Sequence, residues 1–296
     1  MRKRNLQGNL MLLVTAVIWG AAFAVQSMGM DYLEPFTFNG IRTAVGGAAL
    51  IPVYFFLHRE DSSRENRVSN ETIIGGIACG ACLFMASSVQ QIGLTMTTAG
   101  KAGFITALYV LLVPILGIIL RRKTPKRIWI CVLIAVLGFY LLCVKEGFSV
   151  SKGDLLCLAS SFFFSLHIMV IDTYTSRDTD PVLMSCIQFF VVGILSVAPA
   201  ALLETAAWSN ILSAKWAILY TGVISAGVGY TLQIIGQKRT APAAATLILS
   251  LESVFAAVFG WIFLGERLSA REIAGCSLVF SAVLAAQLAP PKKDQN

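Results

Sequence analysis

Ten long apolar runs follow one another along this chain, and they restrict it to a fold that places most of its residues in lipid. The runs lie at about residues 10 to 29, 36 to 57, 72 to 92, 98 to 120, 128 to 144, 154 to 172, 182 to 203, 216 to 236, 243 to 264 and 273 to 289. A transmembrane helix needs about 20 mostly apolar residues. Ten such helices joined by short loops therefore leave no room for a soluble domain. The fifth and tenth runs are the shortest, at 17 residues each.

The composition supports helices as the spanning elements. Apolar residues make up 56% of the chain and charged residues only 13%, which excludes a disordered chain or a coiled coil. The short segments of alternating polarity that a transmembrane barrel requires are absent. Because backbone groups in lipid must be paired within helices or a closed barrel, we predict an all-α polytopic membrane protein with ten transmembrane helices.

The basic residues predict how the helices are oriented. With the N-terminus inside, 16 of the 23 Lys and Arg residues lie on the inner side, six lie outside or at outer helix ends, and Arg42 lies within the membrane. An excess of basic residues marks cytoplasmic loops. We therefore expect both termini in the cytoplasm and the chain in the cell inner membrane. The net charge of +7 then faces anionic lipid rather than nucleic acid.

A shift of 143 residues aligns one half of the sequence with the other. The aligned residues include the shared element Q-x-I-G-x-x-x-T. They are Gln90, Ile92, Gly93, Thr97, Ala102, Ile105, Leu108 and Gly117, which fall on Gln233, Ile235, Gly236, Thr240, Ala245, Ile248, Leu251 and Gly260. Elsewhere the shift is 145 or 146, which pairs Gly8 with Gly153 and Pro35 with Pro181. We predict two five-helix repeats, residues 1–146 and 147–296.

The second repeat must cross the membrane in the opposite sense, because five is an odd number. The loop charges agree with this inversion. Residues 121–127, RRKTPKR, carry five basic side chains, whereas their counterpart at 264–270, LGERLSA, has no net charge. Inverted repeats can adopt two arrangements of similar energy around a site at the midplane, which favours a carrier. Chance similarity between apolar helices is the alternative explanation.

Several motifs resemble the drug/metabolite transporter superfamily, specifically its EamA-type members. They are W-G-x-x-F at Trp19, Gly20 and Phe23, Arg42 in the second helix, the segment 97–114 and the segment 249–269. The resemblance covers essentially the whole chain. It implies ten helices and the export or exchange of small, often amino-acid-like, polar metabolites. Members often carry Glu-Pro where this chain has Glu252-Ser253, so a proline kink is not expected there.

Glu252 is the candidate proton-coupling or cation-binding residue. It lies about ten residues from either end of the ninth apolar run, and the 143-residue shift pairs it with Tyr109 in the fourth. Ionisable groups deep in lipid are costly and usually functional. A substrate-binding role is therefore predicted for both residues. The alternative is a protonated Glu that only packs between helices.

Three further ionisable residues are candidates. Arg42 and Lys101 can each hold a substrate carboxylate, and Arg does so through two hydrogen bonds. Lys101 lies near a helix end, so it can instead extend to the lipid headgroups. His167 can relay protons or simply hydrogen-bond a neighbouring helix.

Uncharged residues complete the predicted substrate site. Gln90 and Gln233 occupy equivalent positions and can line a cavity or bridge helices. Trp19, Tyr109 and Tyr230 can form an aromatic wall, although aromatic residues near helix ends are often interface anchors. The C-x-x-C at Cys79 and Cys82 has no clustered His or carboxylate, so helix packing is favoured over metal binding.

The sequence predicts a transporter rather than an enzyme. It contains no P-loop and no hydrolase or zinc-protease motif, and neither a cofactor nor a metal is expected. The expected partners are a small-molecule substrate and membrane lipid, with the chain a monomer or a homodimer. A lipid flippase or a non-transporting membrane scaffold of the same fold is the second reading, and a membrane enzyme the third.

Overall fold

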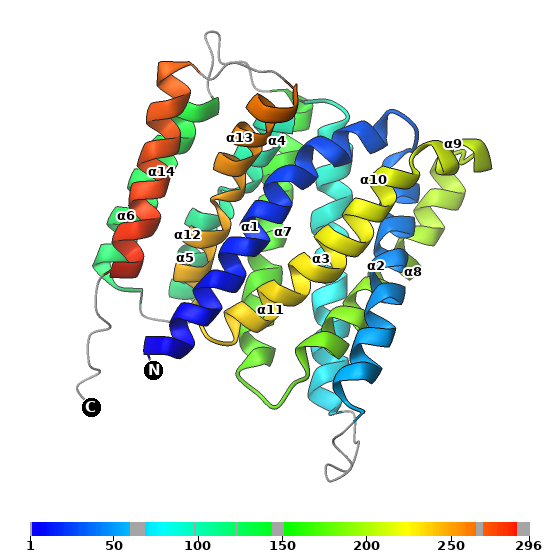
Figure 1. Cartoon of the computed structure of the whole chain (residues 1–296), viewed down its shortest axis with the longest axis horizontal. Helices are drawn as coiled ribbons and strands as arrows, with labels where there is room; N and C mark the ends of the chain where they lie inside the picture. Colours follow the sequence, from blue (N-terminus) through cyan, green and yellow to red (C-terminus); the bar gives the residue numbers. More distant parts are fainter. Residues whose placement is uncertain are drawn as a thin grey trace.

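The computed structural model describes residues 2–59, 69–97, 99–121, 124–143, 151–264 and 269–288. The described residues form helices and no strand, which confirms the predicted all-α class (Figure 1). The helices are α1 (Arg2–Met30), α2 (Pro35–Leu57), α3 (Asn70–Leu94), α4 (Ala99–Thr106), α5 (Tyr109–Ile119), α6 (Lys126–Cys143), α7 (Lys152–Thr175), α8 (Pro181–Leu203), α9 (Trp208–Ser213), α10 (Lys215–Leu219), η1 (Tyr220–Tyr230), α11 (Thr231–Gln237), α12 (Pro242–Leu249), α13 (Glu252–Leu264) and α14 (Ala270–Leu288).

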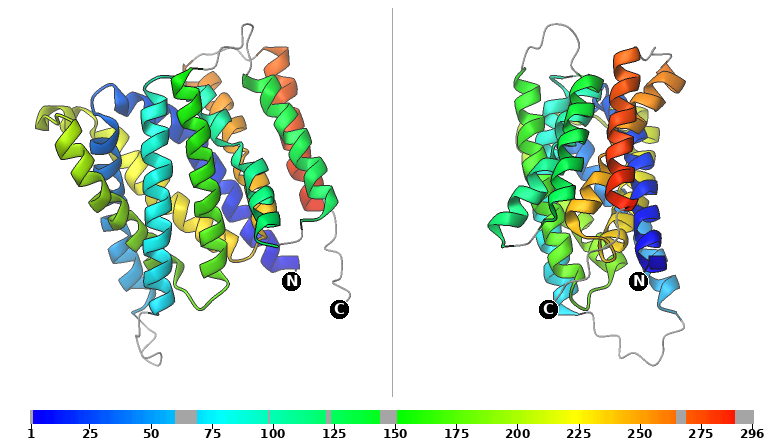
Figure 2. Two further views of the ribbon diagram at one scale, coloured as in Figure 1. Left: turned by 180° about the vertical axis from the view of Figure 1, so that it is seen from behind. Right: turned by 90° about the vertical axis from the view of Figure 1, so that its left-hand side faces the viewer.

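Eight segments of the described chain are long and apolar enough to cross a membrane. They correspond to the first four predicted helices and to the sixth through ninth. α6 and α14 correspond to the fifth and tenth, and they pack against each other at one edge of the bundle (Figure 2). The crossing of the membrane by this pair stays a prediction, as does the cytoplasmic location of both termini.

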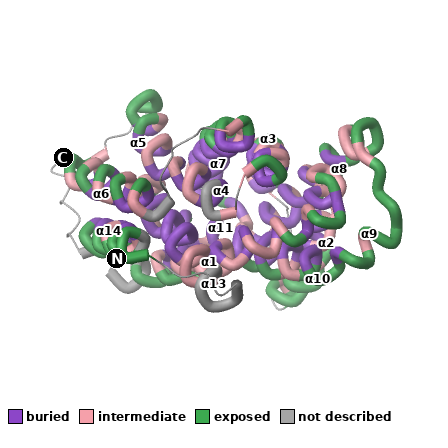
Figure 3. Tube along the Cα trace, turned by 90° about the horizontal axis from the view of Figure 1, so that it is seen from above, coloured by how far each residue is buried: buried purple, intermediate pink, exposed green. Residues whose placement is uncertain are grey.

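The bundle buries its polar interior and exposes apolar side chains around its rim. Figure 3 shows the buried stretches toward the middle and the exposed stretches at the periphery. Large apolar side chains such as Phe56, Leu202 and Ile119 are mostly exposed. In water these side chains would be a liability, whereas in a bilayer they face lipid tails.

Helices of the two halves pack in matching pairs. α1 contacts η1, α11 and α13, while α7 contacts α3, α4 and α5. Glycines allow two equivalent crossings to close tightly, α1 with α11 and α7 with α3. A Cβ at Gly8 would lie 3.1 Å from the carbonyl oxygen of Gly236, and one at Gly153 would lie 2.7 Å from that of Gly93. Any larger residue would push these helices apart.

Two predicted spans are broken in the middle. The fourth consists of α4 and α5, and the ninth of α12 and α13. The breaks lie at Ala107-Leu108 and at Ser250-Leu251, which are related by the 143-residue shift. At each break the backbone switches to bonds between residues three apart. Those bonds are Leu108 N to Ile105 O, Val110 N to Ala107 O, Leu251 N to Ile248 O and Ser253 N to Ser250 O, at 3.0 to 3.2 Å.

The eighth predicted span is also not a regular α-helix. Its central residues form the π-helical stretch η1, between α10 and α11. π-Helical turns are rare and occur frequently at functional sites. The fourth, eighth and ninth predicted spans are thus present as candidate spans, but none of the three is one regular α-helix.

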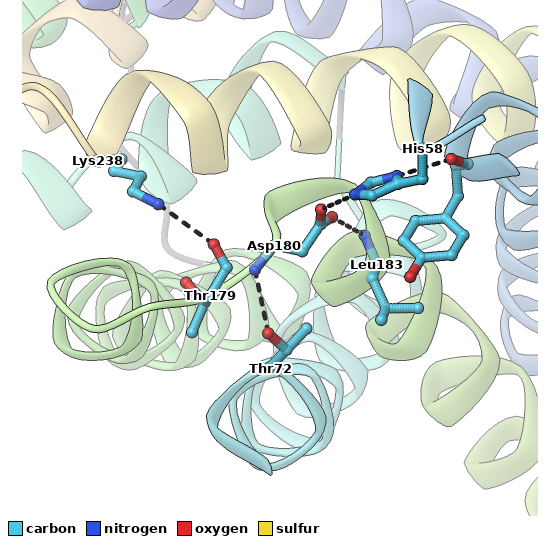
Figure 4. Close-up of polar contacts among 7 residues, drawn as sticks. His58, Thr72, Thr179, Asp180, Leu183 and Lys238 are labelled. Atoms are coloured by element: carbon cyan, nitrogen blue, oxygen red, sulfur yellow. Dashed lines mark hydrogen bonds and ion pairs between the residues drawn. The ribbon is translucent and has the colours of Figure 1, made fainter. Parts of the chain in front are cut away.

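α2 and α8 form an antiparallel pair that is tied at both ends. We call the face where α2, α7 and α11 end the lower face, as drawn in Figure 1. There, Nε2 of His58 lies 3.0 Å from Oδ2 of Asp180, the N-cap of α8 (Figure 4). At the upper face, Glu204 accepts bonds of 2.7 Å from the backbone amides of Phe36 and Thr37 at the start of α2.

The two ties involve equivalent residues. A shift of 146 residues places His58 on Glu204 and Glu34, the N-cap of α2, on Asp180. The lower tie thus joins an imidazole to a carboxylate, whereas the upper tie joins a carboxylate to a helix N-terminus. A negative charge stabilises a helix N-terminus, so both arrangements hold the α2–α8 pair together by different chemistry.

Candidate functional site

A small central cavity lies where the broken helices meet α1, α2 and η1. Its volume, counted as the space that water centres can occupy, is about 40 Å³. Its walls are Trp19, Ala22, Phe23, Gln26, Arg42, Gln90, Thr106, Tyr109, Phe164, Ser225, Tyr230 and Glu252. One water needs roughly 10 to 15 Å³ by this measure. The cavity in this conformation therefore has room for only a few waters.

Six of the eight predicted substrate-binding residues line this cavity. They are Trp19, Arg42, Gln90, Tyr109, Tyr230 and Glu252. Gln233 is buried but lies outside the cavity wall. Lys101 belongs to α4, but its side chain lies outside the described part of the structure.

Glu252 and Tyr109 meet at the two helix breaks. The Tyr109 hydroxyl donates a hydrogen bond of 2.8 Å to Oε1 of Glu252, and both side chains are buried. Each is the first residue of the half-helix that follows its break. The shift of 143 residues that pairs them in sequence thus corresponds to a direct contact.

Arg42 is a buried cation held by a neutral partner. Its Nε and Nη2 donate to Oδ1 of Asn39 at 3.1 and 2.9 Å. Asn39 in turn donates to Oγ of Ser87 on α3 at 2.9 Å, and the guanidinium lies 5.8 Å from the ring centroid of Phe38. Among the described residues, Arg42 forms no ion pair with a carboxylate. It therefore has hydrogen-bonding capacity left for an anionic group in the cavity.

Trp19 and Tyr230 form the aromatic wall. Their ring centroids are 4.6 Å apart. Nε1 of Trp19 donates to the carbonyl oxygen of Ser225 in η1 at 3.3 Å, which ties α1 to the π-helical stretch. The predicted aromatic residues are thus cavity residues in this structure rather than interface anchors.

His167 lies next to the cavity wall and not in it. It is fully buried, and its ring centroid is 5.8 Å from that of Tyr230. Its Nε2 lies 3.0 Å from Oε1 of Gln188 on α8. This contact is the helix-bridging bond that was the alternative to a proton relay.

The site also contains polar residues that were not predicted. Gln26 and Thr106 line the cavity, and Thr106 accepts a bond of 3.0 Å from Gln90. Asn39 supports Arg42. Gln26 is seven residues after Trp19, and Asn39 is three residues before Arg42. Helical spacing therefore places both on the same helix faces as predicted site residues, which is a signal that the sequence offers.

The site contains no metal-binding cluster in the part of the chain that the structure describes. The side chains available for chemistry are instead a cation, a carboxyl group with its phenol partner, and amide and hydroxyl groups. Such a set can bind a polar solute and exchange protons.

Known proteins resemble this chain over most of its length. An uncharacterized transporter of Archaeoglobus fulgidus is 33% identical over 286 residues, covering 96% of this chain and 87% of that protein. The uncharacterized transporter YwfM of Bacillus subtilis is 25% identical over 298 residues, covering 96% and 95%. One solved crystal structure matches with a TM-score of 0.76 at 18% identity, covering 95% of this chain and 96% of its own, and it supports the fold alone.

The family profile that matches is described as the EamA-like transporter family. It matches twice, over residues 6–144 and over residues 151–286. The resemblance noted in the sequence is thereby confirmed. Multiple membrane-spanning helices around a polar cavity agree with such a match, and this chain belongs to the EamA-like transporter family.

Proposed function

We propose that this chain is a secondary transporter that exports or exchanges a small, amino-acid-like metabolite across the cell inner membrane by alternating access. The observation that carries the proposal is the pairing of Arg42 and Glu252 in one cavity without an ion pair between them. A solute with both a carboxylate and an amine has the complementary charges.

The anionic end of the solute is assigned to Arg42. A buried charge is stable only when it is paired or well hydrogen-bonded, and the Asn39 amide occupies only part of the guanidinium. A carboxylate can accept two parallel bonds from such a group. The amine, or a coupling proton, is assigned to Glu252, whose other oxygen is not used by Tyr109.

Alternating access is supported by the equivalent helix breaks. The α4–α5 segment descends and the α12–α13 segment ascends in Figure 1, and they meet at Tyr109 and Glu252. Broken helices at the midplane are common in transporters built from inverted repeats. The cavity of about 40 Å³ is too small for a metabolite, so the solute must enter through an opened form.

A lipid flippase is less well supported. A lateral groove of about 560 Å³ runs between α2 and α8, but its walls are mainly apolar. It shares no residue with the central cavity. The polar side chains converge on the cavity instead, as a water-soluble solute requires.

The test is uptake and efflux of labelled amino acids and other small metabolites by proteoliposomes, with and without a proton gradient. Arg42→Gln and Glu252→Gln are compared with Arg271→Gln and Glu34→Gln, which make the same chemical changes at exposed positions. We expect flux of a zwitterionic solute that only the cavity variants reduce. No flux of any compound by folded protein, or equal flux by all variants, would overturn the proposal.

A further inference from the structure

Unpartnered polar atoms gather below the cavity, between α11 and the α7–α8 pair. Buried side-chain atoms without a hydrogen-bond partner are few among the described residues, and most belong to these three helices. They are Nδ1 of His167, Oγ of Ser185, Nε2 of Gln188, Oγ1 of Thr231, Oε1 of Gln233 and Oε1 of Gln237. A buried polar atom without a partner costs free energy. Such a concentration in one region points to groups that meet water or a solute in another conformation.

One face of the η1–α11 segment covers this region. Tyr230, Gln233 and Gln237 follow one another at intervals of three and four residues and so share a helix face. The upper end of the face contacts α7 and α8, because the Tyr230 ring lies 5.8 Å from those of His167 and Phe189. At the lower end, Nε2 of Gln237 donates to the carbonyl oxygen of Ile168 at 3.1 Å. Gln233 lies between these two contacts.

The α8 side of this region is the counterpart of the Arg42 site. The shift of 146 residues that pairs Pro35 with Pro181 also pairs Arg42 with Gln188 and Asn39 with Ser185. α2 and α8 are both 23 residues long, so the pairing holds along the whole helices. The first half thus places a cation in the cavity wall with an amide that supports it, and the second half places an amide and a hydroxyl below the cavity.

We propose that His167, Ser185, Gln188, Gln233 and Gln237, the α11 seam, form a second binding site for water and for the oxygen-bearing group of the transported solute. The seam is closed in this conformation and opens toward the lower face when α11 moves away from α7 and α8. This inference rests on the proposed transport function. The uncharged donors and acceptors of the α11 seam bind a carboxylate more weakly than Arg42 does. Weak binding is expected of a site that the solute occupies only while it passes through.

Two structural features show how the seam is kept closed. Just beside it, Ile171, Met184 and Ile234 pack with Cys79 in a fully buried apolar cluster. At the lower face, Nζ of Lys238, directly after α11, donates to the carbonyl oxygen of Thr179 at 3.2 Å (Figure 4). Both contacts lie at the end of a segment whose π-helical part can change its hydrogen bonding locally.

The first test measures whether water reaches the seam. Ser185→Cys is treated in native membranes with a small, charged thiol reagent, and mass spectrometry compares its labelling rate with that of Cys157, which is fully buried on α7. We expect Cys at position 185 to react at least tenfold faster. Equal protection of the two thiols would overturn the proposal whether or not a substrate has been found.

The second test separates a binding role from packing. Ser185→Ala and Gln233→Met, which remove groups with an unpartnered oxygen, are compared with Ser160→Ala, whose hydroxyl bonds to its own helix at Cys157 O. Removing an unpartnered group from a packing contact leaves stability equal or higher and transport unchanged. The proposal instead predicts three- to tenfold lower flux at equal or higher melting temperature for the two seam variants. If both seam variants transport as fast as the wild type, only the proposed second binding site is refuted. If the wild type itself shows no flux, the proposed transport function is refuted.

Discussion

The two halves of the cavity region share their backbone geometry and differ in their side chains. Gln90 and Gln233 are equivalent in sequence, as are Thr106 and Leu249. Gln90 donates to Thr106, whereas Leu249 offers no such group, and Oε1 of Gln233 has no partner among the described residues. The repeat thus preserves helix breaks and crossings, while the polar chemistry has become specific to each half.

The two charged residues of the cavity are also divided between the two halves of the chain. Arg42 comes from the first half and Glu252 from the second, and their counterparts Gln188 and Tyr109 are uncharged. A solute bound between them is therefore oriented, with its anionic end toward α2 and its cationic end toward α13. An asymmetric site in a nearly symmetric scaffold binds one solute orientation while two conformations remain close in energy.

The largest effect is expected for Arg42→Gln. A hydrogen bond to a charged group contributes about 1.5 to 3 kcal/mol, so losing the carboxylate contact should lower zwitterion transport by roughly 100-fold. Arg42→Lys should recover only part of it, because Lys lacks the planar fork. The kcat/KM for transport, measured in proteoliposomes, tests whether Arg42 binds the solute. An unchanged kcat/KM in Arg42→Gln would mean that Arg42 is not part of the binding site.

Glu252→Gln should lower flux by about tenfold, or about 1.4 kcal/mol, and abolish its dependence on the proton gradient. The amide still accepts a bond from Tyr109 but cannot gain or lose a proton. Tyr109→Phe should reduce flux less and keep the gradient dependence, because the carboxyl group remains. Gradient dependence that survives in Glu252→Gln would assign proton coupling to another residue.

Thr106→Val and Gln233→Met test the difference between the halves through stability. The first leaves Nε2 of Gln90 buried without its partner, which should cost about 1 to 3 kcal/mol. The second removes an amide whose oxygen is already unpartnered, so no loss is expected. Denaturation in detergent measures both, and equal losses would mean that Gln90 and Gln233 have the same environment.

The smallest effects are expected at the ends of the α2–α8 pair. Glu204→Ala removes three bonds to the start of α2, and loss of a helix cap costs about 1 kcal/mol. His58→Ala removes a partly exposed contact with Asp180, and exposed contacts of this kind contribute at most about 1 kcal/mol. Melting temperatures in detergent distinguish them: Glu204→Ala should lower the melting temperature more than His58→Ala, and the reverse order would contradict this prediction.

The sequence was sufficient for the helical class and for half of the residues that line the cavity. Apolar runs of bilayer length predict helices directly, and rare polar residues within those runs, such as Arg42 and Glu252, are costly enough to indicate a site. The repeat also pairs Tyr109 with Glu252, and the structure shows these two side chains in direct contact.

The remaining features depend on tertiary packing. Neither Ala107-Leu108 nor Ser250-Leu251 contains a helix-breaking residue, so the breaks follow from contacts between helices and not from local propensity. η1 likewise shows no signal in an apolar run. The partner of His167 is on another helix, and sequence spacing alone cannot choose between a relay and a bridge.

Trans-stimulation in proteoliposomes tests most directly whether one cavity serves both faces. Vesicles are loaded with an unlabelled zwitterionic solute, and uptake of the labelled solute is compared with that of empty vesicles. A carrier that alternates around Arg42 and Glu252 should show faster exchange than net uptake in the wild type, with exchange lost in Arg42→Gln. Uptake that is insensitive to internal solute, or exchange that persists in Arg42→Gln, would contradict this mechanism.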